Sequence, residues 1–119
     1  MNKDDLKISD MLDLSKKLWY ENREKWSPMS PEYGKDFILY MIEEIGEVVA
    51  IIKKKNINDI MDNEEVRERF VEELSDVMMY YMDVLNRFGI DSEEFTKSYL
   101  KKFENNMNRD YSKEYDDYI

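Results

Sequence analysis

Residues 42–48, IEEIGEV, and residues 71–77, VEELSDV, decide the fold of this chain. Each stretch places two acidic side chains three positions apart inside an otherwise apolar run. These pairs are Glu44 with Glu47 and Glu73 with Asp76. Because a helix completes a turn in about 3.6 residues, positions three and four apart lie on one face. The carboxylates therefore fall in or beside the face that each helix should bury.

An unpaired carboxylate in an apolar environment costs several kcal/mol, so it needs a cation or must bind a proton. The sequence contains no histidine, and few basic residues lie near either stretch. Ligand sets made only of oxygen favour Mg²⁺, Mn²⁺ or Ca²⁺. If the two helices pack antiparallel, a single metal site could take oxygens from both acidic pairs.

The composition predicts one intracellular helical domain. A length of 119 residues indicates one domain, and 3 Gly and 2 Pro leave room for long regular elements with few turns. A formal net charge of −10 argues against nucleic acid or an anionic membrane surface as a partner. The chain has no cysteine, no apolar signal segment and no apolar run that could span a bilayer, so we expect a soluble cytoplasmic protein.

The apolar periodicity predicts four helices in a core of about residues 8–109, followed by an acidic, tyrosine-rich tail at 110–119. The expected helices cover about 8–26, 31–55, 64–88 and 92–108, with a short polar link at 56–62. The expected N-caps are Ser9 or Asp10, Ser30, Asn63 and Asp91, and Gly89 should end the third helix.

Short links between four helices favour an all-α, antiparallel four-helix bundle formed by the whole of 1–119 as one domain. The second and third helices are apolar over more than half their circumference, so we expect a homodimer or homotetramer to cover them. A di-iron bundle is set aside because its Glu-x-x-His pairs need histidine. Taken singly, Glu43, Glu72 and Asp83 are explained equally well as solvated charge.

The motif Glu43-Glu44-x-x-Glu47, followed after 25 residues by Glu73-x-x-Asp76, resembles that of the MazG-like all-α nucleoside triphosphate pyrophosphohydrolases. This family includes the dimeric dUTPases and dCTP pyrophosphatases. The resemblance implies that Glu44, Glu47, Glu73 and Asp76 bind Mg²⁺, with Mn²⁺ as an alternative.

The resemblance extends over roughly residues 18–109 and implies a nucleotide site. Trp26 is similar to a tryptophan that stacks on the base, and Tyr80 to a tyrosine near the nucleotide. Lys102, Asn106 and Arg109 look like family residues that face the phosphates and sugar. Core packing for Trp26 and Tyr80, and ordinary surface charge for Lys102 and Arg109, remain alternatives.

The implied reaction converts an NTP or dNTP to the monophosphate and pyrophosphate, in nucleotide-pool housekeeping. A water molecule attacks the α-phosphorus, while bound Mg²⁺ offsets the phosphate charge. Glu43, Glu47 and Glu73 are the candidate catalytic residues, and the sequence does not choose the base among them. The alternatives are a non-catalytic helical interaction module on the same scaffold and a pyrophosphohydrolase for another substrate, such as phosphoribosyl-ATP.

Overall fold

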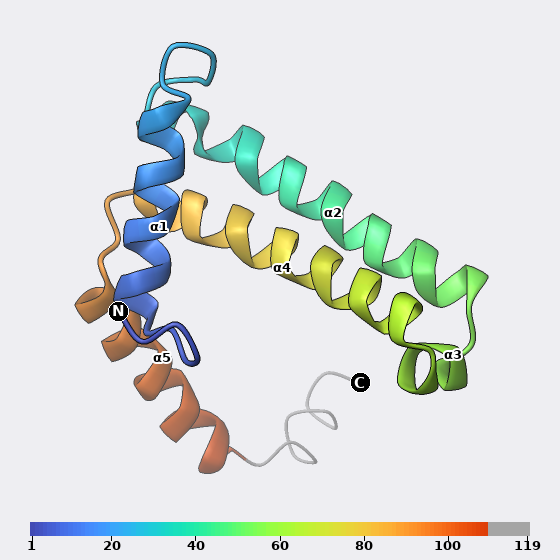
Figure 1. Ribbon diagram of the computed structural model, residues 1–119. Helices are drawn as coiled ribbons and strands as arrows, with labels where there is room; N and C mark the ends of the chain where they lie inside the picture. Colours follow the sequence, from blue (N-terminus) through green and yellow to red (C-terminus); the bar gives the residue numbers. More distant parts are fainter. Residues whose placement is uncertain (110–119) are drawn as a thin grey trace, which may run out of the picture.

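Two long antiparallel helices, α2 (Gly34–Lys54) and α4 (Glu64–Arg87), form the centre of the fold (Figure 1). The computed structural model describes residues 1–109, so the predicted tail at 110–119 lies outside the described residues. The short helix α3 (Ile57–Asp62) joins the two and packs on α4. Within residues 1–109 the chain contains helices and no strand, which confirms the predicted all-α class.

Helix α1 (Ile8–Glu21) packs against α4, and the last helix, α5 (Ser92–Met107), contacts α1. Leu12, Met82 and Leu85 form a small buried core, and Ile8, Met11, Ile90 and Phe95 pack around it. This core lies where α1 meets the C-terminal half of α4. It therefore fixes the end of α4 relative to the segment that follows α1.

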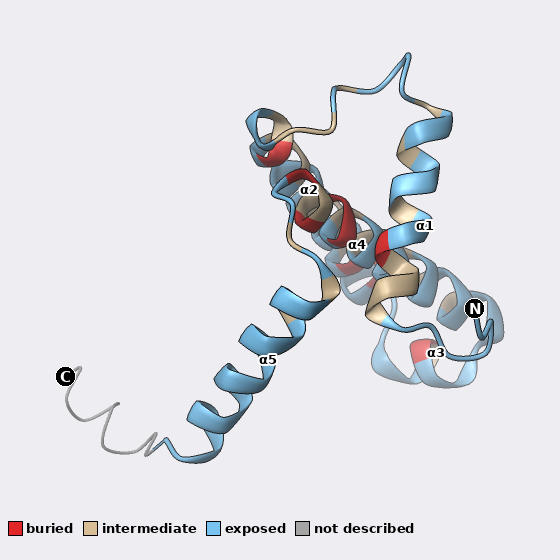
Figure 2. Ribbon diagram, turned by 90° about the vertical axis from the view of Figure 1, so that its left-hand side faces the viewer, coloured by how far each residue is buried: buried red, intermediate tan, exposed pale blue. Residues whose placement is uncertain are grey.

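Helix α5 runs away from α2 and α4 and is exposed along most of its length (Figures 1 and 2). Four of its apolar side chains are more than half exposed: Tyr99, Leu100, Phe103 and Met107. One chain thus packs α1, α2 and α4 together, and it does not place α5 beside α2 and α4 around a common core.

Side-chain caps and a glycine mark several of the helix ends, and some of the predicted ends differ from those in the structure. Asn63 and Asp91 cap α4 and α5 as predicted, because their side chains accept hydrogen bonds from the backbone N–H groups of Val66 (3.2 Å) and Glu94 (2.9 Å). Gly89 ends α4 with φ 67°, as predicted.

Helix α1 begins at Ile8 as predicted, but the predicted N-cap at Ser9 or Asp10 is wrong. Lys7 is the N-cap, and Asp10 accepts a hydrogen bond from its backbone N–H at 3.0 Å. The predicted end at Trp26 is also wrong: α1 ends at Glu21, and the Asn22 side chain donates to the Leu18 carbonyl at 2.8 Å.

The second helix begins later than predicted. Ser30 makes no side-chain capping bond, and residues Pro31–Tyr33 form a single 3₁₀ turn before α2 begins at Gly34. Proline in the first position of this turn is expected, since its missing N–H has no helical partner there.

The outer face of α2 carries an apolar seam at alternating spacings of four and three residues. We call Ile38, Ile42, Ile45, Val49 and Ile52 the α2 seam, and these side chains are 37–56% exposed. Such spacing is typical of a helix that packs against another helix. Within residues 1–109, no helix is both long and apolar enough to cross a membrane.

Candidate functional site

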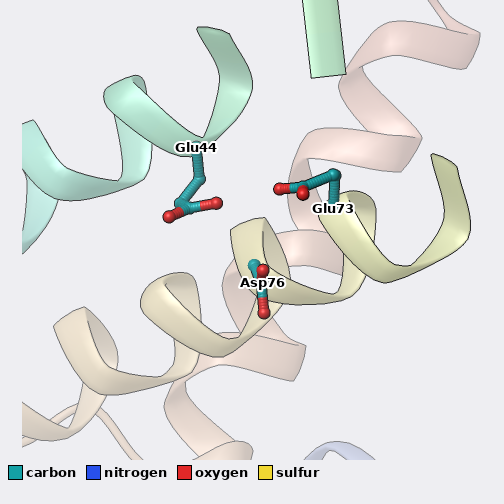
Figure 3. Close-up of side chains that lie close together, drawn as sticks. All are labelled: Glu44, Glu73 and Asp76. Carbon is teal, nitrogen blue, oxygen red and sulfur yellow. The ribbon is translucent and has the colours of Figure 1, made fainter. Parts of the chain in front are cut away.

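Three of the predicted ligands lie together between α2 and α4. Glu44 projects from α2 toward Glu73 and Asp76, which lie one turn apart on α4 (Figure 3). One carboxylate oxygen from each lies within 4.8 Å of the other two. We call these three residues the acidic group. The antiparallel pairing of the two helices therefore brings the two sequence motifs to one place.

The carboxylates of the acidic group lie close enough to one another to affect the pKa of Glu44. Burial raises this pKa above its usual value, and the charge of Asp76, a hydrogen bond with Glu73 and the charges of Glu73 and Glu47 raise it further. Within residues 1–109 none of the three acids forms an ion pair with a lysine or arginine. The group therefore has negative charge that a cation would neutralise.

The donor set fits a hard divalent ion. All of the converging ligand atoms are carboxylate oxygens, which Mg²⁺ and Ca²⁺ prefer. Oxygens bound to one Mg²⁺ lie at most about 4.2 Å apart, so small side-chain rotations would close the group around an ion.

Tyr80 lies one turn beyond Asp76 on α4 and links the acidic group to a set of aromatic rings. Its ring centroid is 6.2 Å from those of both Phe37 and Tyr40. Burial raises the pKa of Tyr80, and the carboxylates of Glu44, Asp76 and Glu43 raise it further. The phenol thus remains a neutral hydrogen-bond donor beside the carboxylates.

A pocket of about 840 Å³ begins at the acidic group and extends to the segment after α1. Asp76 belongs to both the acidic group and the pocket wall. Much of the remaining wall is aromatic or sulfur-containing: Met11, Trp26, Tyr33, Phe37, Tyr40, Met78, Met79, Tyr80 and Met82. The volume and the mainly apolar lining are typical of a small-molecule site.

The other predicted site residues fall into two sets. Glu43 and Glu47 lie on α2 as exposed side chains outside the acidic group, although the charge of Glu47 raises the pKa of Glu44 and that of Glu43 raises the pKa of Tyr80. Lys102, Asn106 and Arg109 lie on or just beyond α5, are exposed and do not line the pocket. Arg109 donates to the Asn106 side chain at 3.5 Å. One chain therefore does not bring these three residues to the acidic group.

Sequence reasoning missed several wall residues. Phe37 and Tyr40 face Tyr80 across the two helices, and Asp83 is 6% exposed rather than solvated. The spacing of Asp76, Tyr80 and Asp83 by four and three residues was the available signal, since it continues the acidic face of α4.

The all-α architecture and the converging carboxylates define a helical protein with a candidate divalent-metal site beside an aromatic pocket. A sequence model for the MazG nucleotide pyrophosphohydrolase domain matches residues 34–109. The chain belongs to this family. The match confirms the resemblance inferred from the acidic motif, and it supports an activity of the nucleotide pyrophosphohydrolase type in a family that generally depends on divalent metal. Neither curated proteins nor solved structures yield a match to the chain.

Proposed function

We propose that this protein is a Mg²⁺-dependent pyrophosphohydrolase that converts a nucleoside or deoxynucleoside triphosphate to the monophosphate and pyrophosphate. The observation that carries the proposal is the position of Asp76, which is shared by the acidic group and the wall of the aromatic pocket. A nucleotide has the same two parts, a polyphosphate that binds through a metal and a flat base that packs against rings.

Different residues would bind different parts of the substrate. Glu44, Glu73 and Asp76 would hold the metal, and a bound Mg²⁺ would neutralise the phosphates and polarise a water molecule. Trp26 and Phe37 line the part of the pocket where the base would pack. The Tyr80 phenol, kept protonated by its neighbours, can donate a hydrogen bond to the sugar or the phosphates.

Glu47 is the stronger candidate for the general base. It lies one turn from Glu44 on α2 and outside the acidic group, so its carboxylate is not committed to the three-residue cluster. Glu43 is the neighbouring alternative, and Glu73 would then act as a ligand that orients the reacting water. An accepting carboxylate must lie within hydrogen-bond reach of that water.

We further propose that the working protein is a homodimer or homotetramer. The α2 seam and the apolar side of α5 are exposed in one chain, and both have the helical spacing that packs well against another helix. Packing between copies would cover these surfaces. It would also allow Lys102, Asn106 and Arg109 to approach the acidic group of another copy.

The direct test is pyrophosphate release from a panel of canonical and modified NTPs and dNTPs, with 5 mM Mg²⁺ or with a chelator. We expect metal-dependent release with the monophosphate as co-product. Glu73→Gln should abolish it while circular dichroism stays helical. An active Glu73→Gln enzyme would refute the assignment of the acidic group. If the folded wild type releases no pyrophosphate from any substrate of the panel, the result would favour the non-catalytic interaction module.

A further inference from the structure

A buried ion pair lies at the C-terminal end of α4, one turn beyond the residues that the proposed reaction uses. Arg87 is 2% exposed and Asp83 is 6% exposed, and the Arg87 Nε donates to a carboxylate oxygen of Asp83. Both continue the face of α4 that carries Asp76 and Tyr80, because the four positions are spaced by four, three and four residues. The face is therefore charged at both ends.

Arg87 joins three separate parts of the chain. Its Nη1 donates to the Pro28 carbonyl at 2.7 Å and to the Ser27 hydroxyl at 3.2 Å. Its guanidinium carbon lies 3.6 Å from the centroid of the Phe37 ring at the start of α2. One side chain on α4 thus holds both the segment between α1 and α2 and the first turns of α2.

Stability alone explains this arrangement poorly. Burying two charges costs several kcal/mol per ion, and an apolar pair of similar size is often as stable. The Arg87 Nη2 is also buried without a hydrogen-bond partner within residues 1–109, which adds a further cost. The pair does, however, specify a geometry, because a planar guanidinium binds in fixed directions.

The held segment is a wall of the pocket. Trp26 and Ser27, together with Phe37 from α2 and Asp83 from α4, all line it. Ser27 is held a second time through its carbonyl, which accepts a hydrogen bond from the Trp19 indole N–H at 2.9 Å. Trp26 itself is 38% exposed and makes no side-chain hydrogen bond within the described residues, so its place depends on these neighbouring contacts.

We infer that Arg87 is a positioning residue: by binding Pro28, Ser27 and Phe37 it fixes the wall that carries Trp26, and so sets the affinity of the pocket for the base of the substrate. The part that concerns the base rests on the proposed function. The part that concerns the wall does not. Arg87 has no role in metal binding, since the acidic group lies elsewhere on α4.

The test compares Arg87→Lys, Arg87→Met and Ser27→Ala with the exposed control Arg69→Lys on the same helix. Lysine keeps the charge but cannot donate in the same forked geometry, and Ser27→Ala removes one bond without burying a new group. The chain is used as purified, with 5 mM Mg²⁺. Amide exchange over residues 22–33 measures the wall directly, and kcat and KM on the best substrate of the panel measure its effect.

We expect faster exchange over residues 22–33 in Arg87→Lys, with exchange in α2 around Glu44 unchanged. KM should rise about ten-fold, which corresponds to about 1.4 kcal/mol of lost binding, while kcat changes much less. Ser27→Ala should show a smaller effect in the same direction, and Arg69→Lys none. The Mg²⁺-induced rise in melting temperature should persist in Arg87→Lys.

Unchanged exchange over residues 22–33 in both Arg87→Lys and Ser27→Ala would overturn the inference. So would a fall in kcat with no change in KM, or faster exchange spread evenly over the chain, which a purely structural role predicts. If the wild type hydrolyses no nucleotide, the proposed function fails, and the exchange data still decide whether Arg87 holds the wall. If Arg87→Met does not fold, the other two variants decide it.

Discussion

Replacing Glu44 by Gln removes one negative charge from the acidic group and leaves the shape of the side chain nearly unchanged. The group places one oxygen of each acid within 4.8 Å of the others. At that distance two unit charges repel by about 0.9 kcal/mol in a water-like dielectric and by about 3.5 kcal/mol at an effective dielectric of 20. Glu44→Gln removes two such repulsions in a half-buried site.

We therefore expect Glu44→Gln to raise the free energy of unfolding of the metal-free protein by about 2 kcal/mol at neutral pH. For a domain of this size that corresponds to a melting temperature about 8 °C higher. Mg²⁺ should stabilise the wild type more than it stabilises Glu44→Gln. Ions that bind only the native state stabilise it by about 2.7 kcal/mol at one hundred times the dissociation constant, and the variant should lose most of this gain.

The pH dependence gives an independent check. Because the pKa of Glu44 is higher in the folded protein than its usual value of 4.5, the native state binds this proton more tightly than the unfolded chain does. The stability of the metal-free wild type should then fall as the pH rises from about 4.5 through the raised folded pKa. The difference between wild type and Glu44→Gln isolates this step from the other acids.

The assay is thermal unfolding followed by circular dichroism in chelator and in 5 mM Mg²⁺, with Glu72→Gln as the matched control. Glu72 is exposed and lies next to Glu73 in the sequence, but it is outside the acidic group. A lower melting temperature for Glu44→Gln in chelator would refute the repulsion argument. An equal Mg²⁺ effect in wild type and variant would refute the assignment of Glu44 as a ligand.

Three further predictions follow from local structure. Gly46→Ala should raise the free energy of unfolding by up to about 1 kcal/mol in urea titrations, because a Cβ at this exposed position of α2 meets nothing within 4 Å; a loss of stability together with a smaller oligomer by light scattering would contradict it and place a second copy there. The pKa of the Tyr80 phenol should lie above 10.0 in chelator, measured as the 295 nm absorbance difference between wild type and Tyr80→Phe. Mg²⁺ should lower this pKa by neutralising the nearby carboxylates. A midpoint at or below 10.0 in chelator would show that those charges do not affect Tyr80. Asn63→Ala should lower the free energy of unfolding by about 1 kcal/mol through loss of the α4 cap, and an unchanged urea midpoint would mean that water replaces the cap.

The acidic group was predictable because helical periodicity orients its members and the short link brings the two helices side by side. Glu44 in one motif and Glu73 with Asp76 in the other each interrupt an apolar face, and a short link between two long helices makes them antiparallel. Two faces that carry unsatisfied carboxylates then meet. The same reasoning predicted the caps at Asn63 and Asp91, since capping depends on residues only three positions apart.

The rest depends on contacts between distant parts of the chain. Arg87 binds Ser27 across 60 residues of sequence, and no periodicity connects the two. Asp83 pairs with Arg87 on this face of α4, and the sequence does not show that the face is buried, so solvated charge was an equally good explanation for Asp83. The position of α5 was also beyond sequence reasoning, because its apolar spacing predicts that it packs against a helix without saying which one.

Helix α4 carries two members of the acidic group, Glu73 and Asp76, and the far wall of the pocket on one continuous backbone. Asp76 and Asp83 both line the pocket, and seven residues of α-helix separate them by about 10.5 Å. Deleting one residue between them would turn everything beyond the deletion by about 100°. The link at α3 can therefore change in length without altering the spacing of these positions on α4, whereas a change of length between positions 76 and 83 destroys the site. If the proposed function holds, the α4 backbone fixes the distance between phosphate and base in the substrate, and changes of substrate should come from substitutions in the wall.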